Sequence, residues 1–172
     1  MIFSTATVPV NPPGEPPLTR EQLWTGLVLK ARDARLFLPE GFCTRCEVVA
    51  EGDGFIVREA VILNDELTEI VTFAPQRKVS FHQVKSPREG VIVNEILEDE
   101  AGALQLRFYA YLGLVGVAPG SEQERQAQAA LDSEERGYKV ALLSTLARTR
   151  ELAKQGRLSL PSQHVSSSAA PR

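Results

Sequence analysis

Two glutamates stand in segments whose alternate residues are apolar, and carboxyl groups in such places could carry out acid–base chemistry. Glu69 alternates with Leu67, Val71 and Phe73. Glu59 alternates with Phe55, Val57, Val61 and Leu63. Residues two apart in a strand share a face, so the pattern predicts that both carboxylates point inward. We therefore take both glutamates as candidates for a catalytic acid or base, or for the polar floor of a ligand site.

An inward carboxylate is costly unless it is protonated or paired, which leaves a second interpretation open. Either glutamate could lie in water at a strand end, or pair with Arg58 or Arg107 of a neighbouring strand. Asn94 presents a similar choice, because it shares a predicted face with Ile92 and Ile96. A buried amide needs hydrogen-bond partners, and these could be a ligand carbonyl or hydroxyl, or a nearby backbone group.

Large apolar side chains at predicted inward positions would form the walls of such a site. The candidates are Trp24, Phe73, Phe81, Phe108, Tyr138 and Leu142. Side chains of this kind more often fill a core, so both roles stay open. In the last predicted strand, Arg107, Tyr109 and Tyr111 should point outward, which makes the two tyrosines candidates for a homodimer interface.

Other kinds of site chemistry find little support in the sequence. Cys43 and Cys46 have C-x-x-C spacing, but a zinc site needs four nitrogen or sulfur ligands. Their odd offset should also send the two thiols to opposite faces of a strand. His82 and His164 stand far apart, and the glycines of 113–120 lack the lysine of a phosphate loop. The sequence therefore predicts no metal site and no cofactor.

The middle of the chain supplies the scaffold for these residues. Between residues 42 and 114, alternating apolar residues are separated by turn signals, which predicts successive antiparallel strands. We expect strands at 43–50, 55–63, 67–73, 78–85, 90–98 and 104–112, after a first strand within 1–10. Two short helices should follow that first strand, at 19–31 and 33–38. Thr19 and Gln22 have the spacing of a capping box at the first helix start.

The last predicted element is helical and runs from Ser121 to Gly156. Ser121 and Glu124 have capping-box spacing, and Gly156 is a typical helix stop. From Tyr138 onward the less polar residues recur every three or four positions, which gives one apolar stripe. The sequence allows one long helix or two helices broken near Gly137. A curved sheet of about seven strands wrapped over this stripe, an α+β helix-grip fold, is the expected architecture.

Length and composition favour one domain and exclude several function classes. The 172 residues, 43% of them hydrophobic, suffice for one core. We expect a single domain over residues 1–157 and a disordered tail at 158–172. A net charge of -3 without a basic face argues against nucleic-acid binding. No apolar run approaches a membrane span and residues 1–10 do not resemble a secretory signal, so we expect a cytoplasmic protein.

Several short stretches resemble one known family. The most specific is Asn11-Pro12-Pro13 followed by the helix start Leu18-Thr19-Arg20-Glu21-Gln22-Leu23-Trp24. Others are Cys46-Glu47-Val48, Arg58-Glu59, Glu69-Ile70-Val71-Thr72-Phe73 and Asn94-Glu95-Ile96. Over residues 1–152 the chain resembles the AtaL-like group of the SRPBCC superfamily, which also holds START lipid-transfer domains, birch-pollen-allergen-type proteins and aromatic polyketide cyclases. The resemblance implies a deep, largely apolar cavity between sheet and long helix, and no catalytic motif.

Three functions are compatible with these features. The first is a binding protein that encloses a small hydrophobic molecule between the sheet and the C-terminal helix. The second is an enzyme of the polyketide cyclase or aromatase kind, in which Glu59 or Glu69 acts as acid or base. The third is a protein with a filled core that works through its surface, as a homodimer formed by Tyr109 and Tyr111.

Overall fold

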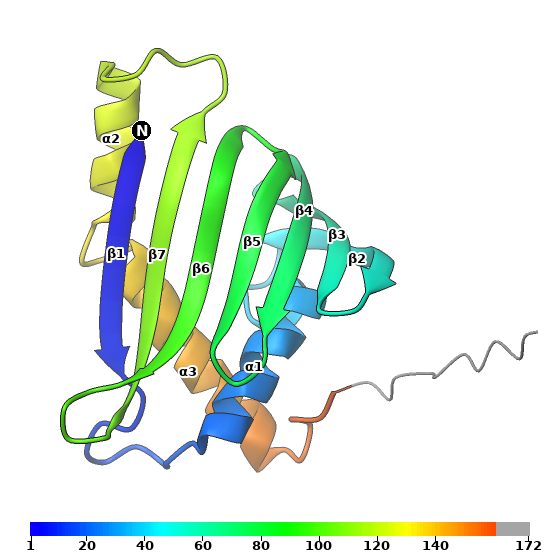
Figure 1. Cartoon of the computed structure of the whole chain (residues 1–172), viewed down its shortest axis with the longest axis vertical. Coiled ribbons are helices and arrows are strands. Elements are labelled where there is room, and N and C mark those ends of the chain that lie inside the picture. The colour runs from blue at the N-terminus through cyan, green and yellow to red at the C-terminus, as the bar shows by residue number, and fades with distance from the viewer. Residues whose placement is uncertain (161–172) are drawn as a thin grey trace, which may run out of the picture.

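A curved antiparallel sheet with helices on one face forms the body of the protein (Figure 1). The computed structural model describes residues 1–160. Its strands are β1 (Ile2–Pro9), β2 (Cys43–Gly52), β3 (Phe55–Ile62), β4 (Asp65–Ala74), β5 (Lys78–Lys85), β6 (Arg88–Glu98) and β7 (Leu104–Leu114). Its helices are α1 (Arg20–Arg32), the 3-10 helix η1 (Ala34–Leu36), α2 (Glu122–Leu131) and α3 (Tyr138–Lys154). Most of the predicted tail, 158–172, lies outside the described residues.

The strand order across the sheet is β1-β7-β6-β5-β4-β3-β2, and every neighbouring pair is antiparallel. From β2 to β7 each strand lies beside the strand that follows it in the chain, which is a simple meander. β1 joins the far edge beside β7, where Ala6 lies opposite Phe108. The seven-stranded sheet and the long helix packed on it confirm the predicted α+β helix-grip fold.

The start of α1 follows its sequence signals closely. Thr19 Oγ1 accepts a hydrogen bond from Gln22 N at 3.1 Å, and Gln22 Oε1 accepts one from Thr19 N at 2.9 Å. This confirms the predicted capping box. Ahead of it, the Asn11 side chain donates to Leu18 O at 3.0 Å and accepts from Leu18 N at 2.8 Å. The hydrogen bonds of Asn11 therefore connect the two ends of the proline-rich linker, and this fixes the position at which α1 begins.

Between residues 121 and 156 the chain forms two helices, and Gly137 marks the break. Gly137 N donates to Ser133 O at 2.8 Å, and a Cβ at Gly137 would lie 2.2 Å from Leu131 O. Only glycine fits this turn, because any side chain would collide with the backbone. Gly156, with φ of 66°, ends α3 as predicted. The predicted stripe is buried at Leu142, Thr145, Leu146, Thr149 and Leu152.

α1 and α3 cross at a close contact between Gly26 and Thr149. A Cβ at Gly26 would lie 2.5 Å from Thr149 Oγ1, and Thr149 has no exposed surface. One turn further along α1, Lys30 Nζ lies 3.1 Å from Thr145 Oγ1, one turn earlier in α3. The missing side chain at position 26 thus allows the close approach that brings Lys30 against α3.

α2 covers the edge of the sheet along β1. The Gln128 side chain donates to Phe3 O at 2.7 Å and accepts from Phe3 N at 3.0 Å. Asp132, at the end of α2, accepts a hydrogen bond from the Ser4 hydroxyl. Gln128 therefore pairs with the outer backbone groups of Phe3 as a residue of a neighbouring strand would.

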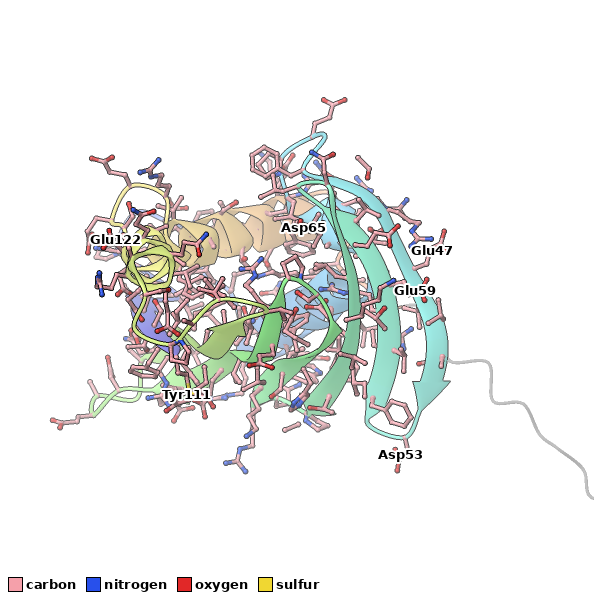
Figure 2. The ribbon with its side chains drawn as sticks, turned by 90° about the horizontal axis from the view of Figure 1, so that it is seen from above. Glu47, Asp53, Glu59, Asp65, Tyr111 and Glu122 are labelled. Atoms are coloured by element: carbon pink, nitrogen blue, oxygen red, sulfur yellow. The ribbon has the colours of Figure 1, made fainter. Side chains whose placement is uncertain are left out.

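β3 buries the face opposite to the one that the sequence predicts. Its inward side chains are Ile56, Arg58 and Ala60, none more than 5% exposed. Glu59 lies on the outer face, with 40% of its side chain exposed and its carboxylate 3.7 Å from Arg45 (Figure 2). The predicted inward position of Glu59 is wrong. Both faces of β3 carry apolar residues, so alternation could not decide which face is buried.

Cys43 and Cys46 of β2 also depart from the prediction, because both point inward. Their exposed fractions are 8% and 4%, and both pack with Ala34 and Ala60. The register of β2 against β3 shifts between Cys43 and Arg45, as in a β-bulge. The shift inserts an extra residue, which brings two cysteines at an odd offset onto one face. Both thiols are free.

Candidate functional site

The inner face of the sheet and the C-terminal end of α1 line a solvent-accessible pocket of about 190 Å³, which we call the central cavity. Its apolar lining residues are Ala34, Leu38, Ile62, Leu67, Phe81, Ile92 and Phe108. Its polar lining residues are Lys30, Arg58, Glu69, Gln83, Arg88 and Asn94. Apolar walls with a small number of polar groups are typical of a small-molecule site.

Arg58, Glu69 and Gln83 form one row across three strands. Arg58 lies opposite Glu69 in the pairing of β3 with β4, and Glu69 lies opposite Gln83 in the pairing of β4 with β5. Arg58 Nε donates to Glu69 Oε2 at 2.9 Å, and Gln83 Nε2 donates to Glu69 Oε1 at 2.6 Å. The inward position of Glu69 is confirmed, at 4% exposed, and so is its alternative role as a partner of Arg58. Both oxygens of this carboxylate are occupied.

Arg58 also joins the sheet to α1. Its Nη1 donates to Ala31 O at 3.0 Å and to Lys30 O at 3.2 Å, two carbonyls in the last turn of the helix. Such carbonyls lack helical partners and carry the negative end of the helix dipole, so a guanidinium suits them. The guanidinium carbon lies 5.0 Å from the ring centre of Phe81. Arg58 is thus a structural anchor that uses four of its five N–H donors within the protein.

Lys30 reaches the cavity wall from α1. Its Nζ lies 3.1 Å from Thr145 Oγ1 and 3.4 Å from Asn94 Oδ1. Burial, and then the positive charge of Arg58, lower the pKa of Lys30 to about 8. Within residues 1–160, Lys30 forms no ion pair with a carboxylate, whereas Lys85 and Lys139 do. An ammonium group bonded only to neutral oxygens is therefore part of the cavity lining.

Arg88 contributes a second cation at another part of the wall. It begins β6, directly after the turn that follows β5. Its backbone N donates to Ser86 Oγ at 3.1 Å, and no ion pair of its guanidinium is found within residues 1–160. Glu69 is the one carboxylate among the lining residues, and Arg58 already pairs with it. The lining of the central cavity therefore has a net positive charge, carried by Lys30 and Arg88.

The predicted wall residues fall into two groups. Phe81, Asn94 and Phe108 line the central cavity, and Asn94 is 1% exposed. Tyr138 stacks on Phe108 with ring centres 3.8 Å apart, directly behind the wall. Burial raises the pKa of Tyr138 to about 12, and its hydroxyl has no hydrogen-bond partner among the described residues.

The other predicted wall residues lie away from the cavity lining. Leu142 is a fully buried core residue of α3. Trp24 and Phe73 pack edge to face, 6.4 Å apart, and line a separate groove with Asp53 and Gly54. Tyr111 lies on the outer face as predicted, 47% exposed and stacked on Phe3 at 4.9 Å.

Sequence reasoning missed three polar residues of the cavity, Lys30, Gln83 and Arg88, and considered Arg58 only as a possible partner of a glutamate. A signal for Lys30 was present, because it follows Leu23 and Leu27 at helical spacing and so belongs to the apolar side of α1. A charged residue within an apolar helical stripe indicates a polar group of the interior, as a glutamate within an apolar strand face does. Arg58 could be recognised as a lining residue only once the inward face of β3 was known. The alternation of residues along β3 did not decide which face that is.

Two further findings concern metals and membranes. Within residues 1–160, no three His, Cys, Asp or Glu side chains gather closely enough to hold a metal ion. The helices of the described region are too short or too polar to cross a bilayer.

Several solved structures share this fold at low sequence identity. The aromatase/cyclase Zhui from Streptomyces sp. R1128 is 16% identical with a TM-score of 0.57, over 88% of this chain and 94% of that one. The di-domain aromatase/cyclase StfQ from the steffimycin pathway is 10% identical with a TM-score of 0.63, over 90% of this chain and 52% of that one. Ara h 8.0201 is 9% identical with a TM-score of 0.56, over 87% of this chain and 97% of that one.

The sequence itself identifies the family. A comparison with curated proteins finds no match. The model of the family described as acetylaranotin biosynthesis cluster protein L, AtaL, matches residues 4–156, which run from β1 to the end of α3. Because the match covers most of the chain, and the solved structures have the fold that the resemblance implied, this protein belongs to the AtaL family.

Proposed function

We propose that this protein binds a small, largely apolar molecule in the central cavity. The observation that carries the proposal is the cavity itself, with seven apolar lining residues and six polar ones in about 190 Å³. A purely apolar cavity of about 150 Å³ is large enough to bind benzene. A ligand part with one or two rings is therefore the right size for this space.

The walls suggest how such a ligand would be held. Phe81 and Phe108 offer aromatic faces, and Ile92 and Leu67 complete the apolar surface. Each 100 Å² of apolar ligand surface removed from water contributes roughly 2.5 kcal/mol. Because Arg58 and Glu69 satisfy each other, they hold the wall in shape without competing for the ligand.

A filling substitution tests the proposal. Ile92→Trp should abolish binding of a neutral aromatic probe such as 2-naphthalenemethanol, measured by isothermal titration calorimetry, because the indole would occupy the cavity. Val84→Trp is the matched control, since Val84 of β5 is 60% exposed. Wild-type protein that binds no such probe, or an Ile92→Trp variant that binds it normally, would overturn the proposal. Native mass spectrometry of the purified protein would identify any molecule that it retains.

A second candidate function, a ring-closing reaction of the cyclase kind, is supported by Lys30. Its pKa of about 8 suits a group that donates a proton near neutral pH. Lys30 would hydrogen-bond a ligand carbonyl oxygen and stabilise the negative charge that develops there during carbon–carbon bond formation. Glu69 suits acid or base work less well, because Arg58 and Gln83 occupy its oxygens.

Product analysis separates these two functions. A cyclase would convert a linear polycarbonyl compound into a product that has lost water, and Lys30→Met would stop the conversion while 2-naphthalenemethanol still bound. Unchanged compounds recovered from wild-type protein that binds them would instead favour a carrier.

A further inference from the structure

The charge that remains in the central cavity indicates what kind of ligand it accepts. Glu69 and Arg58 neutralise each other, whereas Lys30 and Arg88 have no carboxylate partner within residues 1–160. Lys30 and Arg88 are both half-buried, and a cation that is partly removed from water without an anion is costly, so such a site gains from a ligand that supplies the anion.

Lys30 has a donor to offer. An ammonium carries three N–H groups, and two of them are directed at Thr145 Oγ1 and Asn94 Oδ1. Thr145 itself donates to Ala141 O at 2.8 Å, so its oxygen acts toward Lys30 as an acceptor. The third N–H is left for the cavity that Lys30 lines.

Arg88 stands at the other end of the cavity along β6. Asn94 lies six positions further along the strand, roughly 20 Å when extended, and Ile92 lies between them on the cavity wall. Ile62 and Leu67, beside the turn from β3 to β4, and Gln83, before the turn from β5 to β6, line the same end as Arg88. The two cations without a carboxylate partner in the described residues thus lie at different ends of the cavity, Arg88 near the turns and Lys30 against α3.

We propose that the ligand of the central cavity is an acid: an apolar ring system that carries one carboxylate, whose oxygen accepts a hydrogen bond from the Lys30 ammonium. This inference rests on the proposed function and names the ligand class. A hydrogen bond to a charged group contributes about 1.5 to 3 kcal/mol, which corresponds to a roughly 10- to 100-fold preference for the acid over a neutral analogue of the same shape.

The test compares two probes that share a naphthalene ring, one with a charged carboxylate and one with a neutral hydroxymethyl group. Binding of 2-naphthoate and of 2-naphthalenemethanol is measured by calorimetry at pH 7 for wild type, Lys30→Met and Lys78→Met. Met keeps the length of the lysine side chain, and Lys78, exposed on β5, controls for the lost net charge. We expect wild type and Lys78→Met to prefer the naphthoate by about tenfold or more, and Lys30→Met to lose that preference.

The pH dependence of probe binding provides an independent test of the proposal. The charged groups that share the cavity with Lys30 are Arg58, Glu69 and Arg88, and Asn94 and Thr145 face it from β6 and α3. Because Lys30 loses its proton near pH 8, the preference for the naphthoate should fall between pH 7 and pH 9 in wild type. It should stay flat in Lys30→Met.

The outcomes separate the two proposals. Equal affinity for both probes, or a preference that survives in Lys30→Met, would overturn the acid ligand and leave the binding function intact. If wild type bound neither probe, the binding function itself would be overturned, and the acid ligand with it.

Discussion

Arg58 and Glu69 face each other across β3 and β4, and their side chains form an ion pair that is about 95% removed from solvent. The pair lies under the last turn of α1, where Arg58 also binds two carbonyls. It therefore links the sheet, the helix and the cavity wall.

Glu69→Gln should destabilise the fold by about 3 to 5 kcal/mol, because it leaves the buried Arg58 charge without a counterion. Glu59→Gln is the matched control on the outer face and should change stability by less than about 0.5 kcal/mol. Urea unfolding curves of both variants measure the difference. Equal stability of the two would mean that the buried pair does not form in solution.

Lys30→Met should raise stability at pH 7 by about 2 to 3 kcal/mol, since the folded protein holds this ammonium against a lowered pKa. The pKa falls from 10.5 unfolded to about 8 folded, so the unfolded chain binds more protons between these values. The wild-type free energy of unfolding therefore gains on that of Lys30→Met as pH rises from 8 to 10.5. A constant difference between the two across this range would contradict the lowered pKa.

Gly26→Ala should destabilise the protein by about 1 to 3 kcal/mol, because the new methyl group would meet Thr149 at the helix crossing. An exposed helical position would gain about 1 kcal/mol from the same change. Adding Thr149→Ala should recover stability by making room for the methyl group. Thermal unfolding of the single and double variants checks this, and additive losses would show that the clash is relieved elsewhere.

Tyr138→Phe should stabilise the protein by about 1 kcal/mol, since it removes a buried hydroxyl without a partner in the described residues. Tyr111→Phe, at an exposed position, should have little effect. Chemical denaturation compares the two. A loss of stability in Tyr138→Phe would indicate that the hydroxyl is hydrogen-bonded in solution, by water or by a ligand.

The fold could be predicted from local signals because those signals agree with one another. Thr19 and Gln22 marked the start of α1, and β5 has the predicted bounds. Gly137 raised the two-helix alternative, but the choice depended on backbone contacts with Leu131 and Ser133 that no local pattern shows.

The site was harder to predict because it depends on which face each strand buries. Glu69 was placed correctly, since one face of β4 is otherwise apolar and the opposite face is mostly polar, whereas Glu59 shares β3 with apolar residues on both faces. A bulge in β2 places Cys43 and Cys46 on the same face of the strand instead of on opposite faces. A single inserted residue of this kind is hard to recognise from the amino-acid sequence. The single domain, the cytoplasmic location and a homodimer through Tyr109 and Tyr111 stay predictions.

The side chain of Gln128 has a consequence for how this protein behaves at high concentration. By pairing with the backbone of Phe3, it occupies hydrogen-bonding groups that would otherwise recruit a strand from another copy. At the opposite edge, the two register shifts in β2 interrupt the flat ladder that such recruitment requires. Each edge strand of the sheet thus carries a feature that disfavours pairing with a strand of another copy.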